Sequence, residues 1–229
     1  MEKTTNLQVK NQKRPQTVGE EIANAVSHGI IALFGIFALV MLIIKSYNGI
    51  SLFAGIIYGI SIILLHLMSC LYHSLSFTKA KGVFKRFDHI SIFLLIGGTF
   101  APPLLLLPAL TTPFLGATWL LSTGWMLFII QWVFILVGVV FKSIWVHKFQ
   151  AFHYVIYLAL GWSALVFIPA LYSYSVPAFW LILAGGLSYT IGTIFYALSS
   201  KVKYFHFVWH IFVASGAIIH FIAITLYLY

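Results

Sequence analysis

Two histidines in the segment YFHFVWHIFV (residues 204–213) have the spacing of metal ligands. His206 and His210 lie four residues apart, so in a helix both imidazoles project from one face. Helical zinc sites use this spacing to bring two imidazoles to the same ion. The surrounding residues are apolar, and ionisable groups within a membrane are costly unless they have partners. The pair therefore indicates two ligands of a metal site.

Two other segments carry side chains that could complete such a site. In LLHLMSCLYHS, Ser69 and His73 are four residues apart and share a helical face. In RFDHISIF, Asp88 is the only carboxylate after residue 21. Taken alone, His73 is more typical of an interhelical hydrogen bond than of a metal ligand, and Asp88 is equally compatible with an interfacial helix cap. A functional interpretation needs evidence that these residues meet.

The composition indicates that membrane-spanning helices hold these residues. Of the 229 residues, 62% are hydrophobic and 7% are charged, whereas soluble domains carry about 25% charged residues. The net charge of +9 does not indicate nucleic-acid binding, because the basic residues are spread over short loops, as expected for membrane orientation and anionic headgroups. The single cysteine, Cys70, excludes an internal disulfide and a cysteine-based metal cluster.

The hydropathy pattern predicts an all-α integral membrane protein, a bundle of seven transmembrane helices. Residues 1–19 form a polar N-terminal tail, and residues 20–229 form the membrane domain. The breaks between apolar runs predict helices at residues 22–44, 50–73, 88–108, 117–141, 151–171, 177–198 and 205–228.

The basic residues predict the orientation of this bundle. All but one of the 13 Lys and Arg residues fall on the side of the N-terminus, and Lys45 alone falls on the other side. The positive-inside rule therefore places the N-terminus in the cytoplasm and the C-terminus outside. With this topology, Ser69, His73, Asp88, His206 and His210 share one depth near the cytoplasmic leaflet. Independent structural histidines have no reason to share a depth, so the coincidence favours a metal site.

Three imidazoles with an open fourth position are a common arrangement for catalytic Zn²⁺. Iron or copper also accepts three histidines, and a bis-histidine haem is a weaker alternative that leaves Ser69 and Asp88 unexplained. Helix 205–228 has Phe207 where soluble zinc proteases have the general base Glu. Asp88 is therefore the expected base, and Ser69 is expected to hold the attacking water or an oxyanion.

Several segments resemble the haemolysin III family of bacterial membrane proteins. They are EEIANAVSHG (20–29), SCLYHS (69–74), DHISIFLLIGGTFAP (88–102), GWSALVF (161–167), GGLSYTIGTIFYA (185–197) and HFVWHIFV (206–213). The resemblance implies a zinc ion held by His73, His206 and His210, with Ser69 and Asp88 near the bound water. It also implies kinship with the progestin and adipoQ receptors and with alkaline ceramidases, which act, or are proposed to act, on sphingolipid amides. Cys70 and Phe207 replace a common Ser and a common Glu of the family.

The function expected from these observations is that of a zinc-dependent hydrolase of lipid amides or esters in the bacterial plasma membrane. A non-enzymatic lipid sensor with structural zinc is the alternative, and a pore-forming cytolysin is less favoured because the chain has no polar stripe for a wide channel. Membrane lipids are the expected partners, and no oligomeric state is indicated. The roles of three further histidines stay open: His28 either supports the site or is simply interfacial, and His66 and His220 either line a cavity or, as is more typical, pack between helices.

Overall fold

The computed structural model describes residues 14–146 and 148–229, and these ranges form helices without a β-strand element. The first thirteen residues of the predicted polar tail lie outside the described residues. The α-helices are α2 (Val18–Lys45), α3 (Gly49–Ser74), α4 (Lys81–Leu106), α5 (Thr123–Ile144), α6 (Gln150–Trp162), α7 (Ile168–Tyr174), α8 (Val176–Leu198) and α9 (Phe205–Tyr227). Short 3-10 turns lie at Pro108–Leu110, Phe114–Gly116 and Ser163–Val166.

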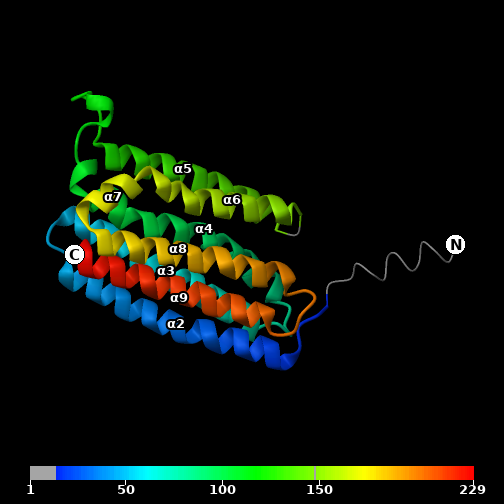
Figure 1. Cartoon of the computed structure of the whole chain (residues 1–229). Helices are drawn as coiled ribbons and strands as arrows, with labels where there is room; N and C mark the ends of the chain where they lie inside the picture. The colour runs from blue at the N-terminus through cyan, green and yellow to red at the C-terminus, as the bar shows by residue number, and fades with distance from the viewer. Residues whose placement is uncertain (1–13, 147) are drawn as a thin grey trace.

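The long helices form one bundle of membrane-spanning length (Figure 1). In the described part of the chain, six helices are long and apolar enough to cross a bilayer: α2, α3, α4, α5, α8 and α9. The pair Phe152–Val166 and Ile168–Tyr174, bent by 48°, makes a seventh span if it is counted as one. The prediction of an all-α transmembrane bundle is thus confirmed.

Two helices begin well before their predicted starts, and a side-chain cap explains the first of them. At the start of α2, Thr17 Oγ1 accepts the Glu20 N–H (3.3 Å), and the Glu20 carboxylate accepts the Thr17 N–H (2.9 Å). This capping box starts the helix at Val18 rather than at residue 22. Helix α4 starts at Lys81, so the predicted basic loop is mostly helical and Asp88 lies about two turns inside the helix.

The outer helices differ from the prediction in two other ways: one begins later than predicted, and one is interrupted. Helix α5 begins at Thr123 instead of residue 117, because the Ser122 side chain accepts the Trp125 N–H and caps it there. The predicted helix 151–171 is interrupted at Ser163–Val166 and resumes at Ile168. Pro169 near the start of α7 has no N–H to continue the ladder, which favours a break just before it.

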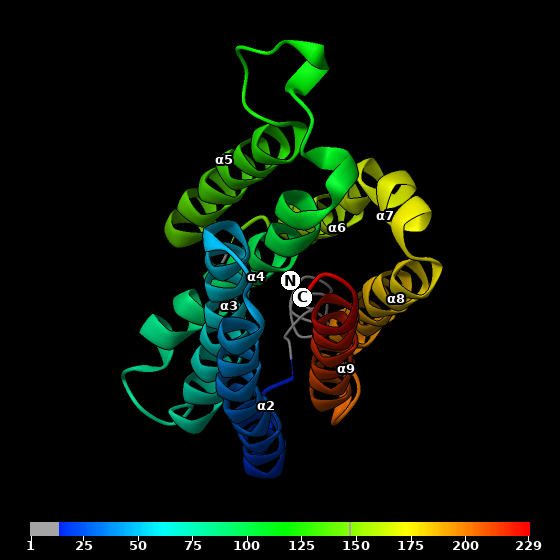
Figure 2. The same ribbon diagram turned by 90° about the vertical axis from the view of Figure 1, so that its left-hand side faces the viewer.

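The helices alternate in direction, so one end of the bundle collects the segments that carry the candidate site. Helices α2, α4, α6 and α9 begin at this end, and α3, α5 and α8 terminate there (Figure 1). We call it the site end. A view along the bundle shows α3, α4, α6, α8 and α9 arranged around its middle, with α5 outside α4 (Figure 2). The side chains that pack in this middle form one apolar core that includes Tyr58, Phe100 and Phe221.

Small residues allow the helices of this core to approach closely, as is usual in membranes. A Cβ built on Gly98 of α4 would lie 2.1 Å from Ser61 Oγ of α3. A Cβ on Gly124, in the first turn of α5, would lie 1.9 Å from the backbone oxygen of Leu104. A flexible side chain can move aside, whereas the Leu104 carbonyl, in the last turn of α4, moves only with the helix backbone.

We therefore expect Gly124→Ala to destabilise the bundle. Overpacking costs about 1–3 kcal/mol, which lowers the melting temperature by several degrees. Gly82→Ala is the matched control, since Gly82 occupies the same second position of α4 and a Cβ there meets nothing within 4 Å. Thermal unfolding in detergent should show the loss for Gly124→Ala and an equal or higher melting temperature for Gly82→Ala. Equal melting temperatures for both variants would contradict the close approach of α4 and α5.

Candidate metal centre

Three histidines from two helices converge at the site end of the bundle. His73 lies in the last turn of α3, and His206 and His210 lie in the first two turns of α9. One nitrogen of each imidazole can be chosen so that all three lie within 4.8 Å of one another, an arrangement that could hold a metal ion. The ring centroids are 4.7–5.1 Å apart. The convergence of these three residues, predicted from their shared depth, is present in the structure.

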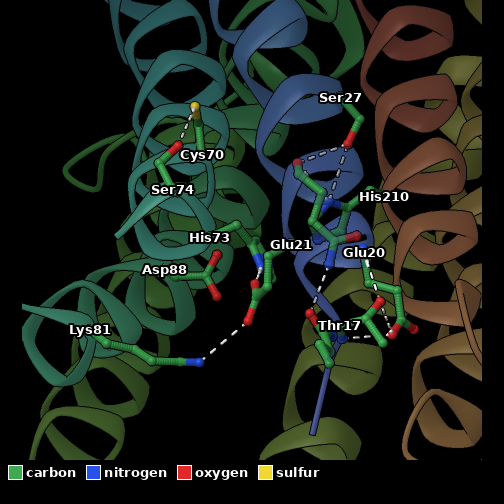
Figure 3. Close-up of polar contacts among 12 residues, drawn as sticks. Thr17, Glu20, Glu21, Ser27, Cys70, His73, Ser74, Lys81, Asp88 and His210 are labelled. Carbon is green, nitrogen blue, oxygen red and sulfur yellow. Dashed lines mark hydrogen bonds and ion pairs between the residues drawn. The ribbon is translucent and has the colours of Figure 1, made fainter. Parts of the chain in front are cut away.

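Helix α2 orients two of the three imidazoles through their Nδ1 atoms. Glu21 Oε2 lies 2.6 Å from His73 Nδ1, and the Asn24 backbone oxygen lies 3.3 Å from His210 Nδ1 (Figure 3). Oxygen acceptors at Nδ1 place the ring proton there and leave Nε2 with a lone pair. Within the described residues, His73 Nε2 is buried and has no hydrogen-bond partner. Both rings are therefore held so that Nε2 is the nitrogen left to bind a ligand.

Glu21 is the site residue that the sequence did not reveal. Its second carboxylate oxygen, Oε1, lies 3.3 Å from Lys81 Nζ, so the carboxylate joins α2 to the ends of α3 and α4 (Figure 3). The expectation that Asp88 is the only carboxylate at this depth is wrong. The signal was the capping box of Thr17 and Glu20, which places Glu21 in the first turn of a helix rather than before it.

Glu20, the neighbouring glutamate, holds the start of α9 against α2. Its carboxylate accepts hydrogen bonds from both terminal nitrogens of Arg14 (2.8 and 2.5 Å) and from the Tyr204 N–H (2.8 Å). Tyr204 has a φ of +61°, an uncommon conformation for a residue with a side chain, directly before α9. The carboxylate thus fixes the position from which His206 and His210 enter the bundle.

Asp88 and Ser69 lie beside the three histidines, as predicted. The Asp88 carboxylate is near His73 and Glu21 (Figure 3) and is mostly buried, with 16% of its side chain exposed. The buried Ser69 side chain lies close to this carboxylate. His89 Nδ1 lies 3.5 Å from Asp88 Oδ2. The structure therefore brings all five predicted site residues to one place, although Asp88 sits inside α4 rather than at its start.

The histidine cluster opens into a cavity of about 330 Å³ in the middle of the bundle. Its polar end contains Ser69, Asp88, His206 and His210, and most of the remaining wall is apolar. Two of its lining residues are exposed on the outer surface: Trp162 at the end of α6 and Leu165 in the 3-10 turn that follows. A cavity of this shape can admit an apolar chain from the bilayer to the histidines.

His28 lies directly against the cluster, on the side away from the site end. Its ring stacks on His210 with a centroid distance of 3.7 Å and meets His66 edge-on at 4.9 Å. Both nitrogens of His28 and Nε2 of His66 are buried without a hydrogen-bond partner in the described part of the chain. His28 is thus a neighbour of a candidate ligand rather than an interfacial residue.

Comparison with known proteins identifies the family. Residues 16–221 match the family model described as Haemolysin-III related. The chain belongs to the haemolysin III family. The resemblance drawn from the six sequence segments is confirmed.

Relatives within and beyond this family match over almost their whole length. Hemolysin-3 of Bacillus cereus is 37% identical over 222 residues, covering 95% of this chain and 96% of the relative. The Hemolysin-3 homolog of Bacillus subtilis (strain 168) is 38% identical over 215 residues, covering 92% and 95%. The human monocyte to macrophage differentiation factor is 24% identical over 226 residues, covering 96% and 89%. The apolar helices and the bacterial relatives together define this haemolysin III protein as a multi-pass protein of the bacterial plasma membrane.

Proposed function

We propose that this protein is a zinc-dependent membrane hydrolase that cleaves an amide or ester bond of a lipid. The observation that carries the proposal is the joint placement of the His73, His206 and His210 cluster and the Asp88 carboxylate at the polar end of an apolar cavity. A lipid chain in the cavity would bring its carbonyl group to the polar end. Membrane lipids are thus the proposed partners.

The donor set fits a zinc ion. Zn²⁺ takes imidazole nitrogens at about 2.0–2.1 Å in tetrahedral sites, which places ligand atoms about 3.3 Å apart. The three nitrogens lie within 4.8 Å of one another, so the pair furthest apart has to close by at most about 1.5 Å on binding. The Glu21–His73 hydrogen bond is the carboxylate–histidine arrangement that commonly supports a metal-binding imidazole. The buried Nε2 of His73 also gains a partner when an ion is present.

The chain's own residues supply the acid–base chemistry. When bound, zinc would polarise a carbonyl oxygen and make water more acidic near neutral pH. The Asp88 carboxylate accepts the proton of the attacking water and returns it to the leaving amine or alkoxide. Ser69, which lies close to Asp88, would hold the attacking water or the developing oxyanion. The apolar walls keep bulk water from the acyl chain.

We infer that the site end faces the cytoplasm. Twelve of the 13 Lys and Arg residues either precede α2 in the sequence or lie at or between the helix ends of the site end. The exception is Lys45, which lies at the opposite end of α2. The positive-inside rule assigns the basic side to the cytoplasm. The N-terminus is then cytoplasmic, the C-terminus is outside, and the substrate comes from the cytoplasmic leaflet.

A non-enzymatic protein with structural zinc is the second candidate. It is favoured by one observation: the histidine cluster and Glu21 join α2, α3 and α9, so an ion there would also clamp three helices. Two relatives carry the name hemolysin, but the cavity of this chain is lined mainly by apolar residues, unlike an aqueous pore. A cytolytic function is therefore less favoured.

Fatty-acid release from N-acylated and O-acylated lipids by the purified, zinc-loaded protein tests the enzymatic proposal directly. We expect release that stops when a chelator removes the metal and returns on addition of zinc. Zinc-loaded protein that releases no fatty acid from either lipid class would favour the structural alternative.

Glu21→Gln is expected to weaken zinc binding by about 10- to 100-fold, because the neutral amide no longer raises the basicity of the His73 ring. Competition with a calibrated chelator measures the dissociation constant. Glu2→Gln is the control: it removes the same charge from the polar N-terminal tail, at a residue that precedes α2 in the sequence. Equal zinc affinities for wild type and Glu21→Gln would show that this carboxylate does not support a metal ligand.

A further inference from the structure

The inner end of the cavity contains a second polar pair, His220 of α9 and Tyr189 of α8. His220 is buried, and the two rings meet edge-on with a centroid distance of 5.5 Å. His220 Nδ1 and the Tyr189 hydroxyl are both buried without a hydrogen-bond partner among the described residues. Hydrocarbon cannot supply such partners, so these two atoms require a polar group inside the cavity.

Two glycines make room for this pair. A Cβ on Gly185 of α8 would lie 2.2 Å from the His220 ring, and a Cβ on Gly216 of α9 would lie 2.8 Å from the Tyr189 ring. In α8, Gly185 lies four residues before Tyr189, and in α9, Gly216 lies four residues before His220. The His220 ring packs over Gly185, and the Tyr189 ring packs over Gly216. The pair is fixed in place by the contact between α8 and α9.

The hydrogen bond on the other side of His220 defines what the pair can bind. His220 Nε2 lies 2.9 Å from the Ile182 backbone oxygen, which can only accept, so Nε2 carries the ring proton. Nδ1 is then an acceptor, while the Tyr189 hydroxyl can donate. A ligand hydroxyl satisfies both atoms, because it donates to Nδ1 and accepts from Tyr189. A keto oxygen would leave Nδ1 without a donor.

The distance between the two polar ends of the cavity defines where that hydroxyl lies. His220 follows His210 by ten residues, which corresponds to about 15 Å along α9. This is about half of the ~30 Å hydrocarbon core, the depth that one leaflet's acyl chain spans. If the carbonyl group of an acyl chain lies at the histidine cluster, the part of that acyl chain next to His220 is therefore in its distal half.

We propose that the cavity selects an acyl chain that carries a hydroxyl group in its distal half, bound between His220 Nδ1 and the Tyr189 hydroxyl. The proposal rests on the proposed lipid-hydrolase function, since it names the chain that this function would act upon. A plain acyl chain of equal length leaves both polar atoms against hydrocarbon and binds less well.

Equilibrium binding of ricinoleate and oleate to the purified full chain in detergent tests the proposal. The two fatty acids differ only by one hydroxyl in the distal half of the chain, and their affinities follow from displacement of a fluorescent fatty acid. We expect ricinoleate to bind at least about tenfold more tightly. Neither probe has a bond to cleave, so the result does not depend on catalysis.

Tyr189→Phe keeps the ring over Gly216 and removes only the hydroxyl. It should therefore reduce the preference for ricinoleate over oleate to below about threefold and leave the affinity for oleate unchanged. Tyr172→Phe, on the exposed face of α7, is the matched control and should retain the full preference. Equal wild-type affinities for the two fatty acids would overturn the proposal and leave water as the partner of the pair, with the hydrolase proposal untouched. Failure of both fatty acids to bind would overturn it together with the lipid-binding role of the cavity.

Discussion

Replacement of Asp88 by asparagine is expected to reduce lipid hydrolysis by about 10²- to 10⁴-fold while the protein keeps its zinc. Asparagine has nearly the shape of aspartate, but it cannot take a proton from water. Phe207 stands between the two histidines of α9 and offers no alternative base. Glu21 is held by His73 and Lys81 and so does not replace Asp88.

The measurement is fatty-acid release by wild type and Asp88→Asn at equal zinc content, with elemental analysis and thermal unfolding on the same samples. Loss of turnover with normal zinc and normal unfolding supports a general base. If the zinc content and the melting temperature both fall, Asp88 has a structural role, and the result supports the non-enzymatic alternative. Unchanged turnover would remove Asp88 from the proposed chemistry.

The double variant His206→Ala/His210→Ala is expected to lower the zinc content from about one ion per chain to nearly none. One imidazole, that of His73, cannot replace a set of three nitrogen ligands. Hydrolysis should be lost with the metal. The cavity stays apolar in this variant, so oleate binding should persist, which separates metal loss from misfolding.

His153→Ala is the matched control for this experiment. His153 is another buried histidine, in the first turn of α6, and its ring lies against that of Phe152 rather than against the cluster. Elemental analysis of this variant should still find about one zinc per chain. Wild type purified without chelators and lacking zinc, or a double variant that keeps it, would contradict the proposed metal site.

The sequence predicted the helices that carry the site because their signals are local and strong. The predicted helix 205–228 differs by one residue at its end from α9, and the prediction 50–73 differs by one residue at each end from α3. Lysine and arginine between apolar runs defined which helix ends lie together. From that alternation alone, His73 could be placed beside His206 and His210.

What the sequence did not reveal depends on contacts between helices. Glu21 was missed because hydropathy marks where an apolar run begins, whereas the capping side chain Thr17 decides where the helix begins. The stacking of His28 on His210 depends on the rotation of α2 about its axis. Apolar side chains facing lipid and apolar side chains facing another helix look alike in a sequence, so such rotations are not encoded in composition.

The origin of the site residues also has a consequence for biogenesis. Glu21 and His73 are synthesised early, in α2 and α3, whereas His206 and His210 belong to α9, the last helix of the chain. Membrane insertion follows the order of synthesis, so the imidazole cluster does not exist until α9 returns to pack against α2. A chain truncated before α9 lacks two of the three imidazoles, and a chain with α9 wrongly inserted does not bring them to His73. Occupancy of the proposed metal site would thereby be a chemical record that α9 has been inserted.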